Sequence, residues 1–204
     1  MIFICSKCGD ETAETICAEI FAHLTRDKHN IYHLVYHVDG FLRALSRLCG
    51  SANINCRTYA CLAIQNISYE LRCVSALATT PQLIDNICLR CLDPNESDVV
   101  HAACMVTLRN ICRSASNVER MFDAPLFMKA LIAFIRTKEL HKENMHLLFL
   151  AKDLVKSIIK LFKFCSYTNN RKSKEEVQRS DSFSTVQSEL ERTLPICWKP
   201  FVPK

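Results

Sequence analysis

Glycine, proline and tryptophan are scarce in this sequence, whose 204 residues include 3 glycines, 6 prolines and 1 tryptophan. Proteins of the all-β and α/β classes use glycine in tight turns and in phosphate-binding loops, so its scarcity argues against both classes. Helices joined by short loops need fewer such residues. Because 49% of the residues are apolar, the chain has enough material for a continuous core. The composition therefore predicts an all-α protein.

A strong charge of one sign is also missing. The 26 basic and 21 acidic side chains give a net charge of +5, without the concentrated basic face that is typical of nucleic-acid binding. No uncharged stretch is long enough for a transmembrane segment. The apolar start, Met1 to Cys5, is followed at once by Lys7 and Asp10, which is unlike a secretory leader. We therefore expect an intracellular protein, cytoplasmic or nuclear, that does not bind nucleic acid.

The 13 cysteines are an odd number in a chain long enough to fold without disulfides. Many of them fall where a helix buries a small apolar side chain, so we expect reduced cysteines in the core. Cys5 and Cys8 form half of a zinc-knuckle pattern, but nothing completes it at conventional spacing. Catalytic signatures are absent as well. The sequence predicts neither an enzyme nor a cofactor, and a small zinc-binding or thiol-dependent protein is an alternative.

One helical apolar pattern recurs along the chain. In residues 55–68 the small or apolar positions are Cys56, Tyr59, Ala60, Ala63, Ile64 and Ile67. They lie on one face of an α-helix. Moving 44 positions forward gives Val100, Ala103, Cys104, Thr107, Leu108 and Ile111. Moving 43 positions back gives Ala13, Ile16, Cys17, Ile20, Phe21 and Leu24. A degraded copy follows in residues 144–155. We expect stacked units to bury these faces.

A second series of helices lies between these faces, at residues 41–48, 82–92 and 126–135. We expect Asp39 and Thr80 to be the N-caps of the first two. A shorter apolar element precedes each of them, at residues 31–37, 71–77 and 118–122. The recurring unit is therefore a short helix, a second helix and a long helix.

This pattern resembles the armadillo repeat family, whose unit has three helices in about 42 residues. The resemblance rests on VDGFLRALSRL (38–48) with RTYACLAIQNIS (57–68), and on TPQLIDNICLRCL (80–92) with VVHAACMVTLRNIC (99–112). It implies a right-handed α-solenoid of about three to four units in residues 12–164. An N-terminal extension (1–11) and a largely disordered, basic and serine-rich tail (165–204) would flank it. A HEAT-type solenoid with two helices per unit is the structural alternative.

The resemblance also implies a groove lined by the third helices. In peptide-binding armadillo proteins this helix carries a tryptophan, followed four residues later by an asparagine that holds a peptide backbone. Asn66 and Asn110 match the asparagine, whereas Leu62 and Val106 replace the tryptophan. The groove edge would carry Arg57, Thr58, His101 and Arg109, and the simpler interpretation of all four is a solvated helix face. The function we expect is a non-catalytic scaffold that binds a protein or an extended peptide. A capping role for the two asparagines is the alternative.

Residues 145–164 form an amphipathic helical pattern. Its basic stripe consists of Lys152, Lys156, Lys160 and Lys163. We expect a terminal helix that covers the end of the core with its apolar face. The alternative is a regulatory subunit that uses this helix to bind a calmodulin-like protein or an acidic membrane. In the tail, Arg179 precedes Ser182 by three residues, which predicts a phosphorylation site at Ser182.

Overall fold

The computed structural model describes one continuous segment, residues 10–122, and short stretches beyond it. These further residues are 124, 126–127, 129–130, 133, 153–154 and 156–158. All regular elements within the described residues are helices, so the predicted all-α class is confirmed for this part of the chain. None of the described helices is long and apolar enough to cross a membrane.

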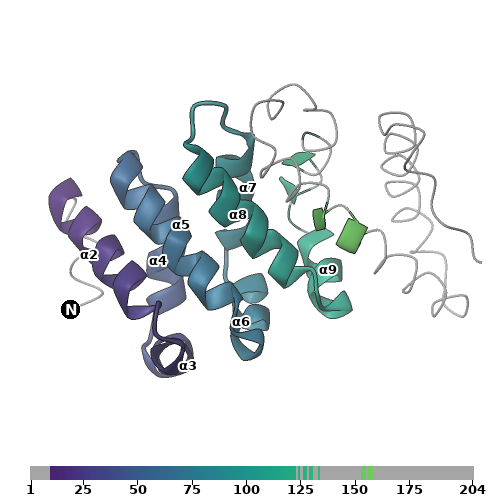
Figure 1. Ribbon diagram of the computed structural model, residues 1–204, viewed down its shortest axis with the longest axis horizontal. Helices are drawn as coiled ribbons and strands as arrows, with labels where there is room; N and C mark the ends of the chain where they lie inside the picture. Colours follow the sequence, from purple (N-terminus) through teal and green to yellow (C-terminus); the bar gives the residue numbers. More distant parts are fainter. Residues whose placement is uncertain are drawn as a thin grey trace, which may run out of the picture.

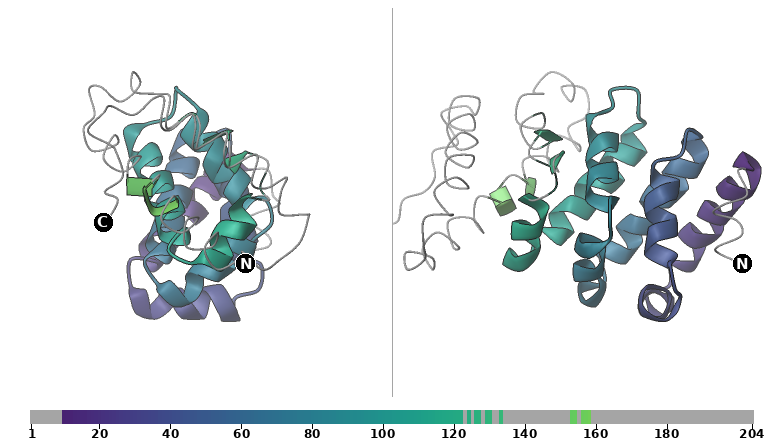
Figure 2. Two further views of the ribbon diagram at one scale, coloured as in Figure 1. Left: turned by 90° about the vertical axis from the view of Figure 1, so that its right-hand side faces the viewer. Right: turned by 180° about the vertical axis from the view of Figure 1, so that it is seen from behind.

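The helices follow one another in a recurring order, in which shorter helices precede a long one. The long helices are α2 (Glu11–Leu24), α5 (Ile54–Ser68) and α8 (Asp98–Ile111). The shorter ones are α3 (Lys28–His37), α4 (Phe41–Cys49), the 3-10 helix η1 (Leu71–Cys73), α6 (Val74–Thr79), α7 (Leu83–Leu92) and α9 (Ala115–Phe122). The long helices pack in chain order, α2 on α5 and α5 on α8, as Figure 1 shows and the rear view in Figure 2 confirms.

Each long helix begins after a side chain that accepts hydrogen bonds from its first turn. The acceptors are Asp10 for α2, Asn53 for α5 and Ser97 for α8. Such caps satisfy backbone N–H groups that have no partner within the helix. Near the other ends, Asn66 of α5 contacts Ala22 of α2, and Asn110 of α8 contacts Ser68 of α5. The three long helices therefore run parallel.

The helices α4 and α7 begin differently from the sequence prediction. The residue before α4 is Gly40 and the residue before α7 is Gln82, both in the left-handed region with φ of 75° and 60°. Neither helix has a side-chain cap at this position. The expected caps Asp39 and Thr80 are therefore wrong, because a left-handed residue stands between each of them and its helix. The Thr80 hydroxyl instead donates to the Ala76 carbonyl at 2.7 Å.

The apolar faces predicted for α5 and α8 are confirmed as buried, apart from the half-buried Tyr59. In α5 the exposed fraction is at most 1% for Cys56, Ala60, Ala63, Ile64 and Ile67. In α8 it is at most 2% for Val100, Ala103, Cys104, Thr107, Leu108 and Ile111. The two sets are 44 positions apart, and the residues at this interval are buried in both helices.

The apolar face predicted for α2 is only partly buried, and the prediction for it needs correction. Phe21 is buried, where its ring packs edge-on against Phe41 with 5.1 Å between centroids. In contrast, Ile16, Ile20 and Leu24 are 51%, 46% and 40% exposed. The physical reason is the order of packing: α2 covers one side of α5, whereas no described residue covers the corresponding side of α2.

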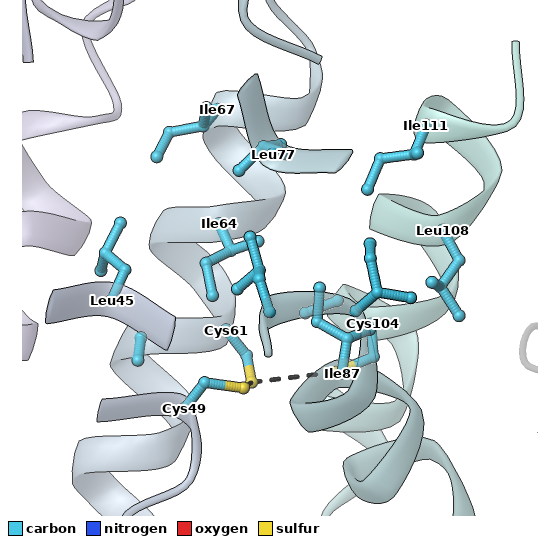
Figure 3. Packing of buried hydrophobic residues seen from close by; sticks show 14 of the residues in the cluster. Leu45, Cys49, Cys61, Ile64, Ile67, Leu77, Ile87, Cys104, Leu108 and Ile111 are labelled. Carbon is cyan, nitrogen blue, oxygen red and sulfur yellow. Dashed lines mark hydrogen bonds between the residues drawn. The ribbon is translucent and has the colours of Figure 1, made fainter. Parts of the chain in front are cut away.

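The described cysteines are reduced, and most of them are core residues as predicted. Those that are buried are Cys49, Cys56, Cys61, Cys73, Cys88, Cys104 and Cys112. The sulfurs of Cys49 and Cys61 are 3.5 Å apart, and the Cys104 thiol donates to the Cys61 sulfur at 3.8 Å (Figure 3). Burial raises the pKa of the Cys112 and Cys88 thiols well above the usual value. These thiols are thus held neutral and act as small apolar side chains.

Candidate interaction surface

One side of each long helix carries side chains that are mostly half-buried or exposed, at equivalent positions. We call this strip the long-helix surface: Thr15 and Glu19 on α2, Thr58, Leu62 and Gln65 on α5, Ala102, Val106 and Arg109 on α8, with Tyr69 and Arg113 just beyond the ends of α5 and α8. The three helices lie side by side (Figure 1), so the strip extends over all three.

The residues predicted to form the centre of this surface are not equally exposed to solvent. Leu62 is half-buried and packs its inner side against the core. Val106, at the equivalent position of α8, is only 6% exposed. The Gln65 amide donates to the Tyr69 hydroxyl at 3.3 Å, and Tyr69 is 55% exposed. On α5 the strip therefore offers an apolar side chain, an amide and an exposed ring close together, at Leu62, Gln65 and Tyr69.

Asn66 and Asn110 link neighbouring long helices. The Asn66 amide donates to the Thr25 hydroxyl at 3.3 Å and to the Ala22 carbonyl at 3.4 Å. The Asn110 amide donates to the Ser68 hydroxyl at 2.9 Å. Each asparagine thus binds a hydroxyl at the C-terminal end of the preceding long helix, about one unit earlier in the sequence.

The two hydroxyls complete these links, since each also donates to a carbonyl near the end of its own helix. The Thr25 hydroxyl donates to the Phe21 carbonyl at 2.8 Å, and the Ser68 hydroxyl donates to the Gln65 carbonyl at 2.6 Å. Both carbonyls belong to the last turn of their helix, and the Phe21 carbonyl also accepts from the Thr25 backbone N–H at 3.0 Å. A chain of two hydrogen bonds therefore fixes the C-terminal turn of one long helix to the next.

The expected partner contact of Asn110 needs correction. Asn110 is 0% exposed, so its amide is not available to a ligand. Asn66 is half-buried, and its amide hydrogens point to α2. The structure agrees better with the capping alternative. Asn66 caps the C-terminal end of α2, however, and not the end of its own helix, α5. Sequence spacing located these asparagines correctly but did not identify acceptors more than 40 residues away.

Arg57, expected at the groove edge, makes a buried ion pair instead. Its guanidinium forms two hydrogen bonds with the Glu96 carboxylate, at 3.0 Å and 2.6 Å. It also donates to the carbonyls of Ser51 and Ala52. The Glu96 side chain is 0% exposed, and a second guanidinium, that of Arg90, lies 3.5 Å from it. The hydrogen bond with Glu96 raises the pKa of Arg57.

This polar cluster joins the start of α5 to the loop before α8. His101 belongs to it as well: the residue is 5% exposed and its ring Nε2 lies 2.9 Å from the Asp93 carbonyl oxygen. The expected solvated face at His101 is therefore wrong. The sequence pattern does not identify Glu96 as an ion-pair residue. A buried arginine needs a carboxylate, but no local pattern indicates which one supplies it.

Arg109 contacts the stretch that follows the long helices. One of its guanidinium nitrogens donates to the Asp153 carboxylate at 3.3 Å, and another donates to the Asn110 side-chain oxygen at 3.4 Å. The side chain is 22% exposed. Arg109 is therefore engaged in helix packing, and only part of it faces solvent.

Only one residue of the predicted lysine stripe lies within the described residues. Lys156 is helical and exposed. Leu154 and Ile158, from the apolar stripe of the same segment, are 0% and 2% exposed and belong to the core. Their burial favours the interpretation in which this segment covers the end of the core. Lys152, Lys160 and Lys163, the phosphorylation site Ser182, and the cysteines Cys5 and Cys8 lie outside the described residues.

Metal-ligating side chains do not cluster in the part of the chain that the structure describes, where no group of three or more could hold an ion. His33 and His37 stack with 5.2 Å between ring centroids on α3.

No protein family model matches this sequence, and no curated protein is significantly similar to it.

Proposed function

We propose that this protein is a non-catalytic interaction module of the armadillo type, a solenoid of three-helix units that binds a protein or an extended peptide on its long-helix surface. The observation that supports the proposal most directly is the parallel stacking of α2, α5 and α8. Hydrogen bonds between consecutive helices hold equivalent residues in register. A partner would therefore meet the same helix face repeatedly along one line.

The chemistry around Leu62 suits an extended chain. Gln65 has an amide that can both donate and accept hydrogen bonds, which matches the two polar groups of a peptide bond. Leu62 offers an apolar contact one turn earlier on α5. Tyr69 adds an exposed ring with a hydroxyl. We assign to Gln65 the backbone-binding role that sequence resemblance suggested for Asn66, because Asn66 is engaged with α2.

Site-specific photo-crosslinking tests this assignment. A photoreactive phenylalanine analogue at position 65 should crosslink a discrete partner in cells of the source organism. The same analogue at Arg43, which is exposed on α4, is the matched control and should not crosslink that partner. Adding Leu62→Glu should reduce the yield at position 65 by at least about fivefold, since a carboxylate is costly to place in an apolar contact.

Two results would count against the proposal. One is equal crosslinking of the same protein from positions 65 and 43. The other is an undiminished yield with Leu62→Glu when circular dichroism shows that the variant retains its helices. The asparagines are unsuitable for this test, because changing Asn110 would disturb packing within the protein itself.

A further inference from the structure

The side of α2 that faces away from α5 is apolar and exposed. Ile16, Ile20 and Leu24 are spaced by four residues, so they form one stripe on this helix. Their exposed fractions are 51%, 46% and 40%. We call this stripe the α2 face. No described residue covers it.

Equivalent positions on the other long helices are covered. On α5 they are Tyr59, Ala63 and Ile67, and on α8 they are Ala103, Thr107 and Ile111. Tyr59 is half-buried, and the other five are at most 1% exposed. On α5 these residues share a side with Asn66, which contacts α2. On α8 the equivalent residues share a side with Asn110, which contacts α5, so we infer that the preceding parallel long helix covers this side in both cases.

A polar residue accompanies the apolar stripe at the same position on all three long helices. It is Asn66 on α5 and Asn110 on α8, and each donates to a hydroxyl on the preceding helix. On α2 this position is His23, whose side chain is 56% exposed. An imidazole N–H can donate to a hydroxyl as an amide does. The α2 face thus combines the apolar and polar parts of a helix-binding side.

We propose that the α2 face docks a further α-helix, supplied by a partner and running parallel to α2. The surfaces that cover α5 and α8 indicate its chemistry. Toward α5, α2 presents the Ala22 carbonyl and the Thr25 hydroxyl, with the buried Ala18 one turn before Ala22; toward α8, α5 presents the Cys61 sulfur and the Ser68 hydroxyl. The docked helix accordingly has small side chains along its contact stripe and a serine or threonine in its C-terminal turn, within reach of His23.

This face is separate from the long-helix surface, and the two make different demands on a partner. The α2 face requires a helix, whereas the long-helix surface around Gln65 suits an extended chain. The inference does not depend on the proposed function. Each can fail alone, because the two tests use different residues.

A peptide copy of α2 is a suitable probe, because α2 is the helix that covers the equivalent side of α5. The probe is residues 10–26 with a lactam between Ala13→Lys and Cys17→Glu, away from the contact stripe, since a free helix of this length is marginal in water. Ile20→Lys within the probe prevents its stacking on itself. Fluorescence anisotropy should show saturable binding of this peptide to the full-length chain.

Two matched substitutions in the full-length chain locate the site. Ile20→Glu should weaken binding of the probe by at least about tenfold, because it buries a carboxylate against apolar groups. Ile54→Glu, at an isoleucine of α5 that is 47% exposed, should leave binding unchanged. Both substitutions replace an isoleucine of similar exposure by glutamate. A difference between their effects on binding therefore shows where the peptide binds.

A double-mutant cycle tests the polar contact. Thr25→Val in the probe should weaken its binding to the full-length chain by about threefold, the size of a typical net hydrogen bond. The same probe change should have no effect on a chain that carries His23→Ala.

Three outcomes would overturn the proposal. The first is the absence of saturable binding by the probe. The second is equal weakening by Ile20→Glu and Ile54→Glu. The third is binding that occurs only after residues 1–9 are deleted, which would assign the α2 face to the chain's own first segment.

Discussion

The contacts that join α5 to α8 and to the loop before α8 lie in the interior, whereas the contacts of α2 with α4 and α5 are closer to solvent. Asn110 is 0% exposed, but Asn66, with the same type of hydrogen bond, is half-buried. The Glu96 carboxylate is 0% exposed, whereas Glu14, which pairs with Arg47 at 2.8 Å, is 16% exposed. Similar contacts can therefore contribute different amounts to the free energy of unfolding, because the cost of losing a partner rises with burial.

The largest difference between the two regions is expected for their ion pairs. Glu96→Ala should lower the free energy of unfolding by about 3–5 kcal/mol, because it leaves the buried guanidinium of Arg57 without its partner. Glu14→Ala should lower it by at most about 1 kcal/mol, since Arg47 is 46% exposed and water can replace the carboxylate. Urea denaturation of both variants measures the contrast. Equal losses would remove the distinction between the two regions.

Alkaline pH should affect the region around α7 and α8 next most strongly. The pKa values of Cys88 and Cys112 are raised by burial, and burial also raises that of Cys73, to about 11. A raised pKa means that the unfolded chain loses these protons first, so stability is complete below about pH 8.5 and falls as pH rises. The free energy of unfolding should fall by up to about 1.4 kcal/mol per pH unit for each such thiol.

The double variant Cys88→Ala, Cys112→Ala tests this origin of the pH dependence. It should be less stable at neutral pH but should show a shallower decline between pH 8.5 and 10.5. Urea titrations at several pH values give the slope. An unchanged slope would mean that other groups cause the decline.

The asparagine links should differ by a smaller amount. Asn110→Ala should cost about 2 kcal/mol, because the amide is wholly buried and the Ser68 hydroxyl loses a donor. Asn66→Ala should cost about 1 kcal/mol or less, since water can reach its site. Thermal unfolding of the two variants ranks them. The reverse order would show that α2 depends on its polar link more than α8 does.

The smallest effect is expected at the residues that precede α4 and α7. Gln82 has a φ of 60°, where its counterpart before α4 is a glycine. Gln82→Gly should stabilise the protein by about 0.5 kcal/mol, because relief of the left-handed strain exceeds the added freedom of the unfolded chain. Gly40→Ala should destabilise it by about 1 kcal/mol. Chemical denaturation measures both, and a loss of stability with Gln82→Gly would contradict this account.

The sequence predicts well what depends on local spacing. The apolar positions of α5 and α8 recur at helical intervals, and the same residues are buried in the structure. The caps Asp39 and Thr80 were wrong by one or two positions, because sequence does not indicate that Gln82 adopts a left-handed conformation. Boundaries of this kind depend on backbone geometry more than on residue type.

The sequence does not predict contacts between residues that lie far apart along the chain. Ile20 lies in the same apolar pattern as Ala63, yet only Ala63 has a neighbouring helix over it. Asn66 and Arg57 resemble surface residues until their partners, Thr25 and Glu96, are known. These partners lie about one unit away, and spacing within a single helix carries no information about them.

The parallel arrangement of α2, α5 and α8 also places the negative ends of their dipoles together along one edge of the stack. Antiparallel helices largely cancel one another's dipoles, but parallel ones add, with positive ends together and negative ends together. Charged side chains lie where they oppose this sum. Glu11 and Asp98 are in the first turns of α2 and α8, while Arg26 and Arg113 follow their last turns. Reversing the sign at Arg113 would therefore strengthen the negative potential at the end of α8 and, within the screening distance of about 10 Å, toward the adjacent end of α5.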